Sequence, residues 1–360
     1  MNKSVLSAIV GYGLFAFFHA LSAVWFFARA AASRIVPDKD RAPRRLPHEP
    51  RFLSVGEHGV RGLERLPAVP PIPPHIRTVA IAGCANLAMY TFGAAYALQR
   101  APNYAERLAE GSLVASGGSS GAFVAAPLAM GIDCGRVMLR LCHTAFVRHR
   151  RRFGGCVGIF SQSVRGILAQ GLAEARRRGD DPLAKLAPGD GDMPGDGDRL
   201  RVSVTRFAPQ PEHVVVSRFA SEAELLDAVL ASCHIPVAYE SPLVLPRHGF
   251  CIDGCALRFL PAADLVISPY HVHLAEATPR AQYPSSMVFN LLHASDILRL
   301  FEDGYLDTVR WLEEGGGASR DAERRAKAGA APLASSMRAL VAEGVGVALE
   351  IAGFSGGRSR

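Results

Sequence analysis

Hydrophobic and polar positions alternate along most of the chain in the manner of an α/β protein. Short apolar runs bounded by polar or glycine-containing turns predict buried strands at 78–82, 112–116, 200–206, 213–217, 249–253 and 264–268. Longer segments between them have apolar residues at helical spacing and predict helices near 87–99, 133–150, 158–178, 222–231 and 289–314. Strands that alternate with helices predict one mostly parallel sheet with helices on both faces.

The amino-terminal segment has a different pattern. Residues 5–27 form a run of 23 residues without Asp, Glu, Lys or Arg, long enough to cross about 30 Å of hydrocarbon as a helix. A cleavable signal peptide and a buried core helix are the alternative interpretations. More basic residues follow this segment than precede it, which favours a cytoplasmic position for the rest of the chain. We therefore expect a single-pass membrane anchor over residues 1–32.

Changes in amino-acid composition after residue 32 predict three further segments. Residues 33–75 are rich in Pro and Arg and predict an extended linker. Residues 76–313 contain the α/β pattern, and residues 314–360 predict loosely attached helices and a disordered end. The segment 188–198 alternates Asp and Gly like a surface insert. It lacks the spacing and the closing Glu of an EF-hand loop, so no metal site is expected there.

Charge and cysteine content narrow the functional classes. The net charge is +7, with arginine clusters at 148–152 and 176–178. These clusters are typical of solvated helix faces, and the alternative is attraction to anionic lipid headgroups. No DNA- or RNA-binding motif accompanies them, so a nucleic-acid partner is not expected. Seven cysteines without a C-x-x-C pair favour reduced thiols over a disulfide framework or a zinc site.

The main candidate for chemistry is Ser119. It lies in Gly117-Gly118-Ser119-Ser120-Gly121, between a predicted strand and a predicted helix. That context is typical of a nucleophile elbow, in which small residues allow a sharp turn and the helix start favours a developing anion. A Gly/Ser-rich turn without catalytic function is the alternative. Neither a P-loop nor a dinucleotide-binding fingerprint is present.

Asp253-Gly254 follows a later predicted strand and supplies a candidate base. In all, four segments in order resemble motifs of the patatin-like phospholipases, and within them the branch of adiponutrin and adipose triglyceride lipase. They are the glycine-rich segment 82–93, the elbow 117–121, the segment 219–236, which ends in Ala-Ser-Cys-His-Ile-Pro, and the segment 252–255. A fifth segment, 304–312, resembles the helix that closes the family's domain. The resemblance covers residues 78–313.

The resemblance implies a patatin-like fold and a lipid acyl hydrolase with a Ser–Asp dyad. Ser119 would attack an acyl ester, and Asp253 would accept its proton and later activate water, without a histidine. Gly117, Gly121 and Gly254 would support the elbow and the dyad, and no cofactor is needed. The substrates would be phospholipids or triacylglycerols reached from a membrane surface. The sequence does not specify a protein partner or an oligomeric state.

The oxyanion hole is where the chain departs from the family pattern. Backbone N–H groups of Gly83, Cys84 and Ala85 would form the hole, and Ala85 stands where the family has glycine. A left-handed conformation at Ala85 would cost about 1–2 kcal/mol. Ala88 replaces the last glycine of the loop, and Cys255 replaces the small third residue of the D-G-G/A motif. A catalytically silent lipid-binding or scaffold protein is therefore one alternative, and a lipid acyltransferase is another.

Overall fold

The computed structural model describes residues 49–56, 59–144, 160–186, 198–206, 211–234, 243–256, 263–270, 275–280, 282–284, 287–288 and 293–315. The predicted anchor over residues 1–32, most of the predicted insert and nearly all of the carboxyl-terminal tail lie outside these residues. Within the described part of the chain, no helix combines the length and the apolar character that a membrane crossing needs.

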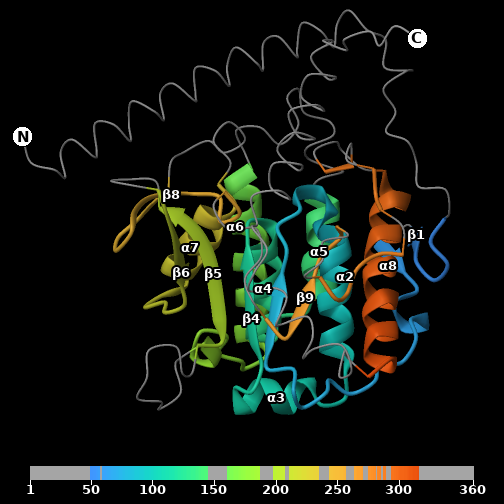
Figure 1. Ribbon diagram of the computed structural model, residues 1–360. Helices are drawn as coiled ribbons and strands as arrows, with labels where there is room; N and C mark the ends of the chain where they lie inside the picture. The colour runs from blue at the N-terminus through green and yellow to red at the C-terminus, as the bar shows by residue number, and fades with distance from the viewer. Residues whose placement is uncertain are drawn as a thin grey trace, which may run out of the picture.

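A seven-stranded sheet forms the centre of the domain (Figure 1). Its order is β7 (Leu243–Leu245), β8 (Gly249–Ile252), β5 (Leu200–Arg206), β4 (Val114–Gly118), β3 (Thr78–Ile81) and β9 (Leu265–Ile267), and β6 (Glu212–Val216) also pairs with β5. The expectation of a mostly parallel sheet was wrong. Strands β9, β3, β4 and β5 run parallel, whereas β6, β7 and β8 pair in antiparallel fashion. The connections β5–β6 and β7–β8 are too short for a parallel crossover, so hairpins form there.

Most predicted helices are confirmed to within a few residues. They are α2 (Ala88–Arg100), α4 (Ser120–Met130), α5 (Cys134–His143), α6 (Phe160–Arg177), α7 (Glu222–Ser232) and α8 (Ala294–Glu313). The short α3 (Tyr104–Glu110), β7 and the hairpin of β1 (Ser54–Gly56) with β2 (Gly59–Arg61) were not predicted. Helices α4 and α7 pack on the sheet, and α2 lies between α4 and α8 (Figure 1).

The two faces of the sheet around β3 are covered differently. Val79 and Ile81 belong to the main core, whereas Ala80 and Val266 form a small separate cluster with Ala275. Alternate residues of a strand point to opposite faces, so this second cluster marks the other face. The sequence pattern had predicted helices on both faces of the sheet. Among the described residues, the residue that packs on this second face is Ala275, which lies in a non-helical segment.

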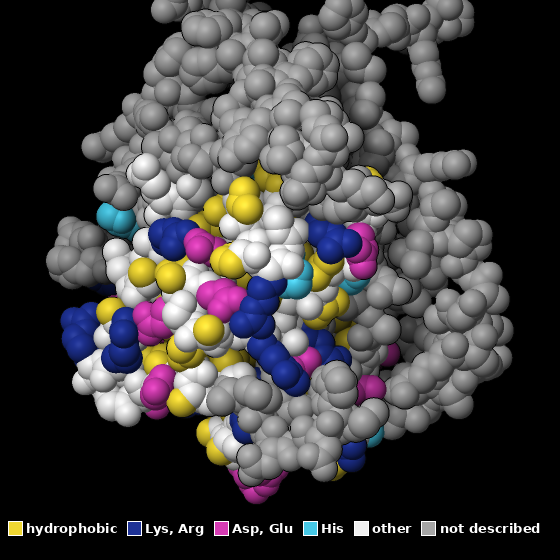
Figure 2. All heavy atoms as spheres, turned by 90° about the vertical axis from the view of Figure 1, so that its left-hand side faces the viewer, with side chains coloured by type: hydrophobic (Ala, Val, Ile, Leu, Met, Phe, Trp, Pro, Cys, Tyr) yellow, Lys and Arg dark blue, Asp and Glu magenta, His cyan; other side chains and the backbone are white. Residues whose placement is uncertain are grey.

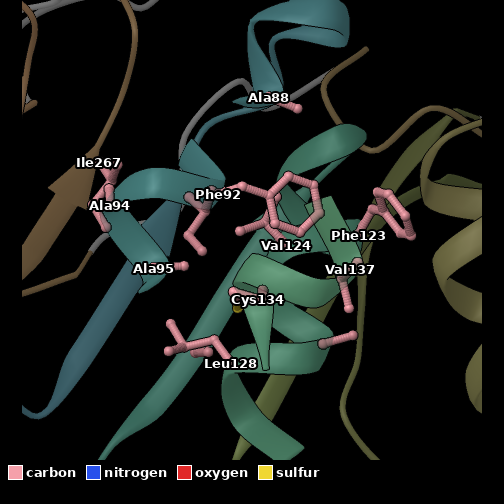
Figure 3. Close-up of a cluster of buried hydrophobic side chains, with 14 of the residues drawn as sticks. Ala88, Phe92, Ala94, Ala95, Phe123, Val124, Leu128, Cys134, Val137 and Ile267 are labelled. Atoms are coloured by element: carbon pink, nitrogen blue, oxygen red, sulfur yellow. The ribbon is translucent and has the colours of Figure 1, made fainter. Parts of the chain in front are cut away.

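The helix α4 is the centre of the main core. Ten of its eleven residues are buried, and it is apolar all round, as expected for a helix enclosed on every side. Figure 3 shows its side chains Phe123, Val124 and Leu128 among residues of α2 and α5. The ring of Phe123 meets that of Phe92 edge-on, with 5.5 Å between the ring centroids. The helix that begins directly after Ser119 is therefore firmly fixed.

The helices α2 and α8 approach each other closely through reciprocal glycines. A Cβ atom on Gly93 would lie 1.9 Å from the carbonyl oxygen of Phe301, and one on Gly304 would lie 1.9 Å from that of Tyr90. Both contacts are shorter than any side chain allows. The pair can therefore pack at this distance only because each helix presents a glycine to the backbone of the other.

The carboxyl-terminal part of the segment predicted as a linker packs on this helix pair. Leu53 and Ile72 are buried in the main core. The buried carboxylate of Glu302 in α8 accepts hydrogen bonds from the backbone N–H groups of residues 51–53, at 2.7, 2.8 and 3.2 Å. These contacts tie the start of the described chain to the helix that ends the domain.

Candidate active site

Ser119 lies between β4 and α4, in a strained backbone conformation. Its φ is 54° and its ψ is −135°, a region that residues other than glycine rarely adopt. The flanking glycines are required by close approach. A Cβ on Gly117 would lie 2.4 Å from the Gly121 backbone, and one on Gly121 would lie 2.1 Å from the Ile81 carbonyl oxygen. The sharp strand–turn–helix geometry is the one that a nucleophile elbow needs.

Side chains at the carboxyl-terminal end of α7, Ser232 and the C-cap residue Cys233, hold this strained turn in place. The Ser119 N–H donates to the Ser232 hydroxyl oxygen at 2.9 Å, and the Ser232 hydroxyl donates to the Ser203 carbonyl at 2.6 Å. The Cys233 thiol donates to the Ser119 carbonyl at 3.0 Å. The sequence had given Ser232 no role, although it lies in the segment that resembles the family motif. Its buried hydroxyl connects the elbow to the neighbouring strand β5.

The register of the sheet brings Asp253 to Ser119. Gly118 at the end of β4 lies opposite Ser203 of β5, and Ile252 at the end of β8 lies opposite Thr205. Strand β6 covers the other edge of β5, so β4 and β8 share one edge and run toward each other. Their ends are about two residues, or roughly 7 Å, apart along β5. Asp253, the residue after β8, enters this gap from the side opposite Ser119.

The backbone around Asp253 is fixed by the end of α7. The Asp253 N–H donates to the His234 carbonyl at 3.0 Å, and the Gly254 N–H donates to the Ser232 carbonyl at 2.9 Å. A Cβ on Gly254 would lie 1.9 Å from the Ser203 carbonyl oxygen, so only glycine fits there. His234 is buried, and its ring packs edge-on against Phe250. The structure thus brings three predicted site residues together: Ser119, Asp253 and Gly254.

The environment of Asp253 favours proton acceptance near neutral pH. Burial raises the pKa of Asp253 to about 6, and hydrogen bonding to the Ser119 hydroxyl and the Cys255 N–H offsets part of the increase. The Cys255 N–H donates to Oδ1 at 2.8 Å. The buried Oδ2 has no partner of ordinary hydrogen-bond geometry among the described residues, so the contact with Ser119 is a loose one. Such hydrogen bonds often tighten only when substrate binds.

The predicted oxyanion loop lies beside Ser119, and its geometry is unusual. A Cβ on Gly83 would lie 2.8 Å from the Ser119 Cβ and 2.4 Å from the Cys255 sulfur. Ala85 has a φ of 46°, which is the left-handed conformation expected from the glycine it replaces. The Cys84 N–H donates to the Ser120 hydroxyl oxygen at 2.9 Å. The sequence did not reveal that Ser120 and Cys255 contact this loop.

The thiols around the dyad are in the reduced form. The cysteines of the described residues are free: Cys84, Cys134, Cys142, Cys233, Cys251 and Cys255. Burial raises the pKa of the Cys84 thiol to about 12 and that of the Cys255 thiol well above its usual value. Both sulfurs are therefore neutral, weakly polar groups at neutral pH, and neither is activated as a nucleophile.

Two hollows on the surface of the described residues lie away from Ser119 and Asp253. One of about 520 Å³ lies between Arg77 and the residues of α3, and another of about 490 Å³ lies around Arg218 and Phe219. Neither is lined by Ser119 or Asp253, and Ser119 is 9% exposed. The candidate site is therefore identified by the chemistry of Ser119 and Asp253 and by the strained backbone of Ser119, and not by a surface hollow.

Comparisons with known proteins identify the family of this chain. A family model described as patatin-like phospholipase matches residues 79–266, more than half of the chain. The chain is 27% identical over 266 residues to the 1-acylglycerol-3-phosphate O-acyltransferase Pnpla3 of Mus musculus, covering 66% of this chain and 59% of that protein. It is 30% identical over 167 residues to the omega-hydroxyceramide transacylase of Homo sapiens, covering 46% of this chain and 28% of that protein.

Among solved structures, VipD from Legionella pneumophila matches over 76% of this chain and 72% of that one, with 13% identity and a TM-score of 0.37. That likeness is too distant to support an argument. The chain spans less than two thirds of the length of the mouse relative. The family match over more than half of the chain is sufficient on its own: this chain belongs to the patatin-like phospholipase family.

Proposed function

We propose that the chain is a serine acyl hydrolase of glycerolipids in which Ser119 is the nucleophile and Asp253 the general base. One observation carries the proposal: a strained serine at the start of α4 meets a buried carboxyl group whose pKa is raised to about 6. The carboxyl group is ionised at neutral pH and still basic enough to accept a proton from a hydroxyl.

The proposed reaction has two halves. In the first, the Ser119 oxygen bonds to the acyl carbon, and its proton passes to Asp253 and then to the departing alcohol. In the second, Asp253 accepts a proton from water as the water oxygen bonds to the acyl carbon. The bond from that carbon to the Ser119 oxygen then breaks, the fatty acid is released, and Asp253 returns the proton to Ser119. Backbone N–H groups of the 83–85 loop and the amino-terminal end of α4 stabilise the negative oxygen in both halves.

Acyl transfer is the second candidate, and the names of two relatives favour it. A lipid hydroxyl would replace water in the second half of the reaction, and the roles of Ser119 and Asp253 would not change. The two candidates differ in their products. With a radiolabelled acyl donor and an acceptor lysophospholipid, hydrolysis releases labelled fatty acid, whereas transfer labels the acceptor.

The proposal includes attachment to a membrane through the apolar segment predicted as an anchor, residues 1–32. Figure 2 shows that basic, acidic and hydrophobic side chains are interspersed on the described part of one face. In the arginine cluster 176–178, Arg176 pairs with Glu222 at 2.9 Å. This face offers no unbroken basic surface in its described part, so lipid headgroups alone would hold it weakly. Full-length protein should stay with membranes at alkaline pH, whereas protein without residues 1–45 should not.

Labelling by a fluorophosphonate probe tests the nucleophile directly. Full-length protein in detergent is expected to label, and Ser119→Ala is expected to abolish the labelling while the protein stays folded. Turnover is then measured with phospholipid and triacylglycerol substrates. Folded wild-type protein that neither labels nor turns over lipid would favour the silent lipid-binding alternative.

A further inference from the structure

One residue at the carboxyl-terminal end of α7 is bonded to both sides of the proposed dyad. On the side of the nucleophile, the Ser119 N–H donates to the Ser232 hydroxyl oxygen at 2.9 Å. On the side of the base, the N–H of Gly254 donates to the carbonyl oxygen of the same Ser232, also at 2.9 Å. Ser232 therefore holds the nucleophile through its side chain and the residue after Asp253 through its main chain.

The direction of the Ser232 hydroxyl is fixed by strand β5. The hydroxyl donates its proton to the Ser203 carbonyl at 2.6 Å, so a lone pair of its oxygen is left to accept the Ser119 N–H. A Cβ on Gly254 would lie 1.9 Å from that same carbonyl oxygen and 2.9 Å from the Ser232 hydroxyl oxygen. Ser203, Ser232 and Gly254 are thus in direct contact, and a shift of one must move the others.

The N–H and the carbonyl of Ser119 are held with different redundancy. The carbonyl accepts hydrogen bonds from the Cys233 thiol at 3.0 Å and from the Ala122 N–H at 2.9 Å. Among the described residues, the Ser232 hydroxyl is the one acceptor of the Ser119 N–H. Its loss would leave this N–H unpaired in a residue whose φ of 54° already disfavours a side chain. The turn would then relax, and the Ser119 hydroxyl would move relative to Asp253.

We propose that Ser232 is a positioning residue that sets the separation of Ser119 and Asp253. This inference rests on the proposed function. Proton transfer requires the serine hydroxyl and the carboxylate to come within hydrogen-bond distance of each other. A displacement of about 1 Å between reacting groups can lower a rate by about 100-fold. Ser232 is 0% exposed and cannot touch a lipid, so its effect falls on kcat and leaves lipid binding unchanged.

The test compares the same substitution at the two ends of α7, in the full chain. Ser232→Ala removes the acceptor of the Ser119 N–H. We expect kcat and the rate of fluorophosphonate labelling to fall about 10- to 100-fold, with KM unchanged. Ser221→Ala is the matched control, because the Ser221 hydroxyl caps the amino-terminal end of α7 and accepts from the Glu224 N–H at 3.2 Å. It should lower the unfolding temperature, since the helix loses its cap, and leave kcat unchanged.

A second variant, Ser232→Cys, measures how the effect depends on the acceptor. A thiol accepts hydrogen bonds more weakly than a hydroxyl does. The kcat of Ser232→Cys should therefore lie between those of the wild type and Ser232→Ala. Thermal unfolding of each variant shows that the compared proteins are folded. If Ser232→Ala does not fold, Ser232→Cys takes its place in the comparison with Ser221→Ala.

Three outcomes overturn the inference. Equal kcat in the folded variants at positions 232 and 221, with labelling lost in Ser119→Ala, would remove the role of Ser232 and leave the proposed function standing. A change confined to KM would show that Ser232 acts on substrate binding and not on the geometry of the dyad. No labelling of the folded wild type would refute the proposed function and the inference together.

Discussion

Two buried aspartates of this domain have nearly the same acidity and different surroundings. Burial raises the pKa of both Asp253 and Asp307 to about 6. Asp307 on α8 accepts a hydrogen bond from the Tyr90 hydroxyl at 3.1 Å and pairs with Arg310 at 2.8 Å. Asp253 has one backbone donor, and its Oδ2 has no ordinary hydrogen-bond partner among the described residues. A raised pKa therefore does not identify a reactive group; an unoccupied lone pair beside a nucleophile does.

The regions around the two aspartates also differ in backbone strain. Near Asp307, Gly93 and Gly304 let α2 and α8 pack without strain. Near Asp253, the residues Ser119 and Ala85 have positive φ angles, and they are the only residues other than glycine that do so in the described part of the chain. Backbone strain is concentrated at functional sites, where the surrounding structure must hold it. The domain thus combines a relaxed helix pair with a strained elbow.

The largest expected difference between the two aspartates is in turnover. Asp253→Asn should lower kcat by about 10³-fold or more, because an amide cannot accept the serine proton. Asp307→Asn should stay within about threefold of the wild type. In addition, wild-type kcat should rise about tenfold per pH unit up to pH 6 and then level, as the base ionises. Steady-state pH profiles of the wild type and of both variants measure this, and equal losses in the two variants would show that the two carboxyl groups are not functionally distinct.

The sequence predicts the two residues of the proposed dyad better than it predicts the contacts that bring them together. Ser119 and Asp253 stand in local motifs, and each motif includes the small residues that its turn requires. The direction of β8 was missed, because a short apolar run has the same pattern in parallel and antiparallel sheets. Strand β7 has only three residues, too few for a pattern. Ser232, Ser120 and Cys255 act through side-chain contacts that only the folded register creates.

Substitutions in the helix pair α2 and α8 should lower the stability of the protein, whereas substitutions at the elbow should lower its activity. Gly93→Ala or Gly304→Ala would place a Cβ 1.9 Å from a carbonyl oxygen, and we expect a loss of about 3 kcal/mol. Thermal unfolding should then begin roughly 6–12 °C lower. Gly166→Ala on α6 is the control, because its added Cβ would meet no atom within 4 Å apart from the neighbouring backbone of its own helix. It should gain about 0.5–1 kcal/mol. Equal effects at the three glycines would contradict the close approach of α2 and α8.

The pH dependence of the free energy of unfolding should also differ between the Asp253→Asn and Asp307→Asn variants. The folded pKa of each is about 6, above the ordinary value of 3.8, so stability present below pH 4 is lost as the pH rises through 6. Asp253→Asn removes this loss and should gain about 3 kcal/mol at pH 7, a gain that disappears near pH 4. Asp307→Asn should gain less, because an amide oxygen cannot serve both Tyr90 and Arg310. Urea unfolding at the two pH values measures both differences, and a pH-independent gain would exclude titration of Asp253 as its cause.

The smallest effect concerns the strain at Ala85. Its φ of 46° disfavours any side chain, so Ala85→Gly should raise the free energy of unfolding by about 1 kcal/mol. Ala88 offers a matched control, since it also stands where the family has glycine but has an ordinary helical φ of −55°. Ala88→Gly should therefore lower stability by about 1 kcal/mol. Opposite signs at two positions three residues apart would show that Ala85 keeps its left-handed conformation in solution, although a side chain disfavours it. Equal signs would mean that the loop has relaxed, and the oxyanion donors would then have to be sought elsewhere.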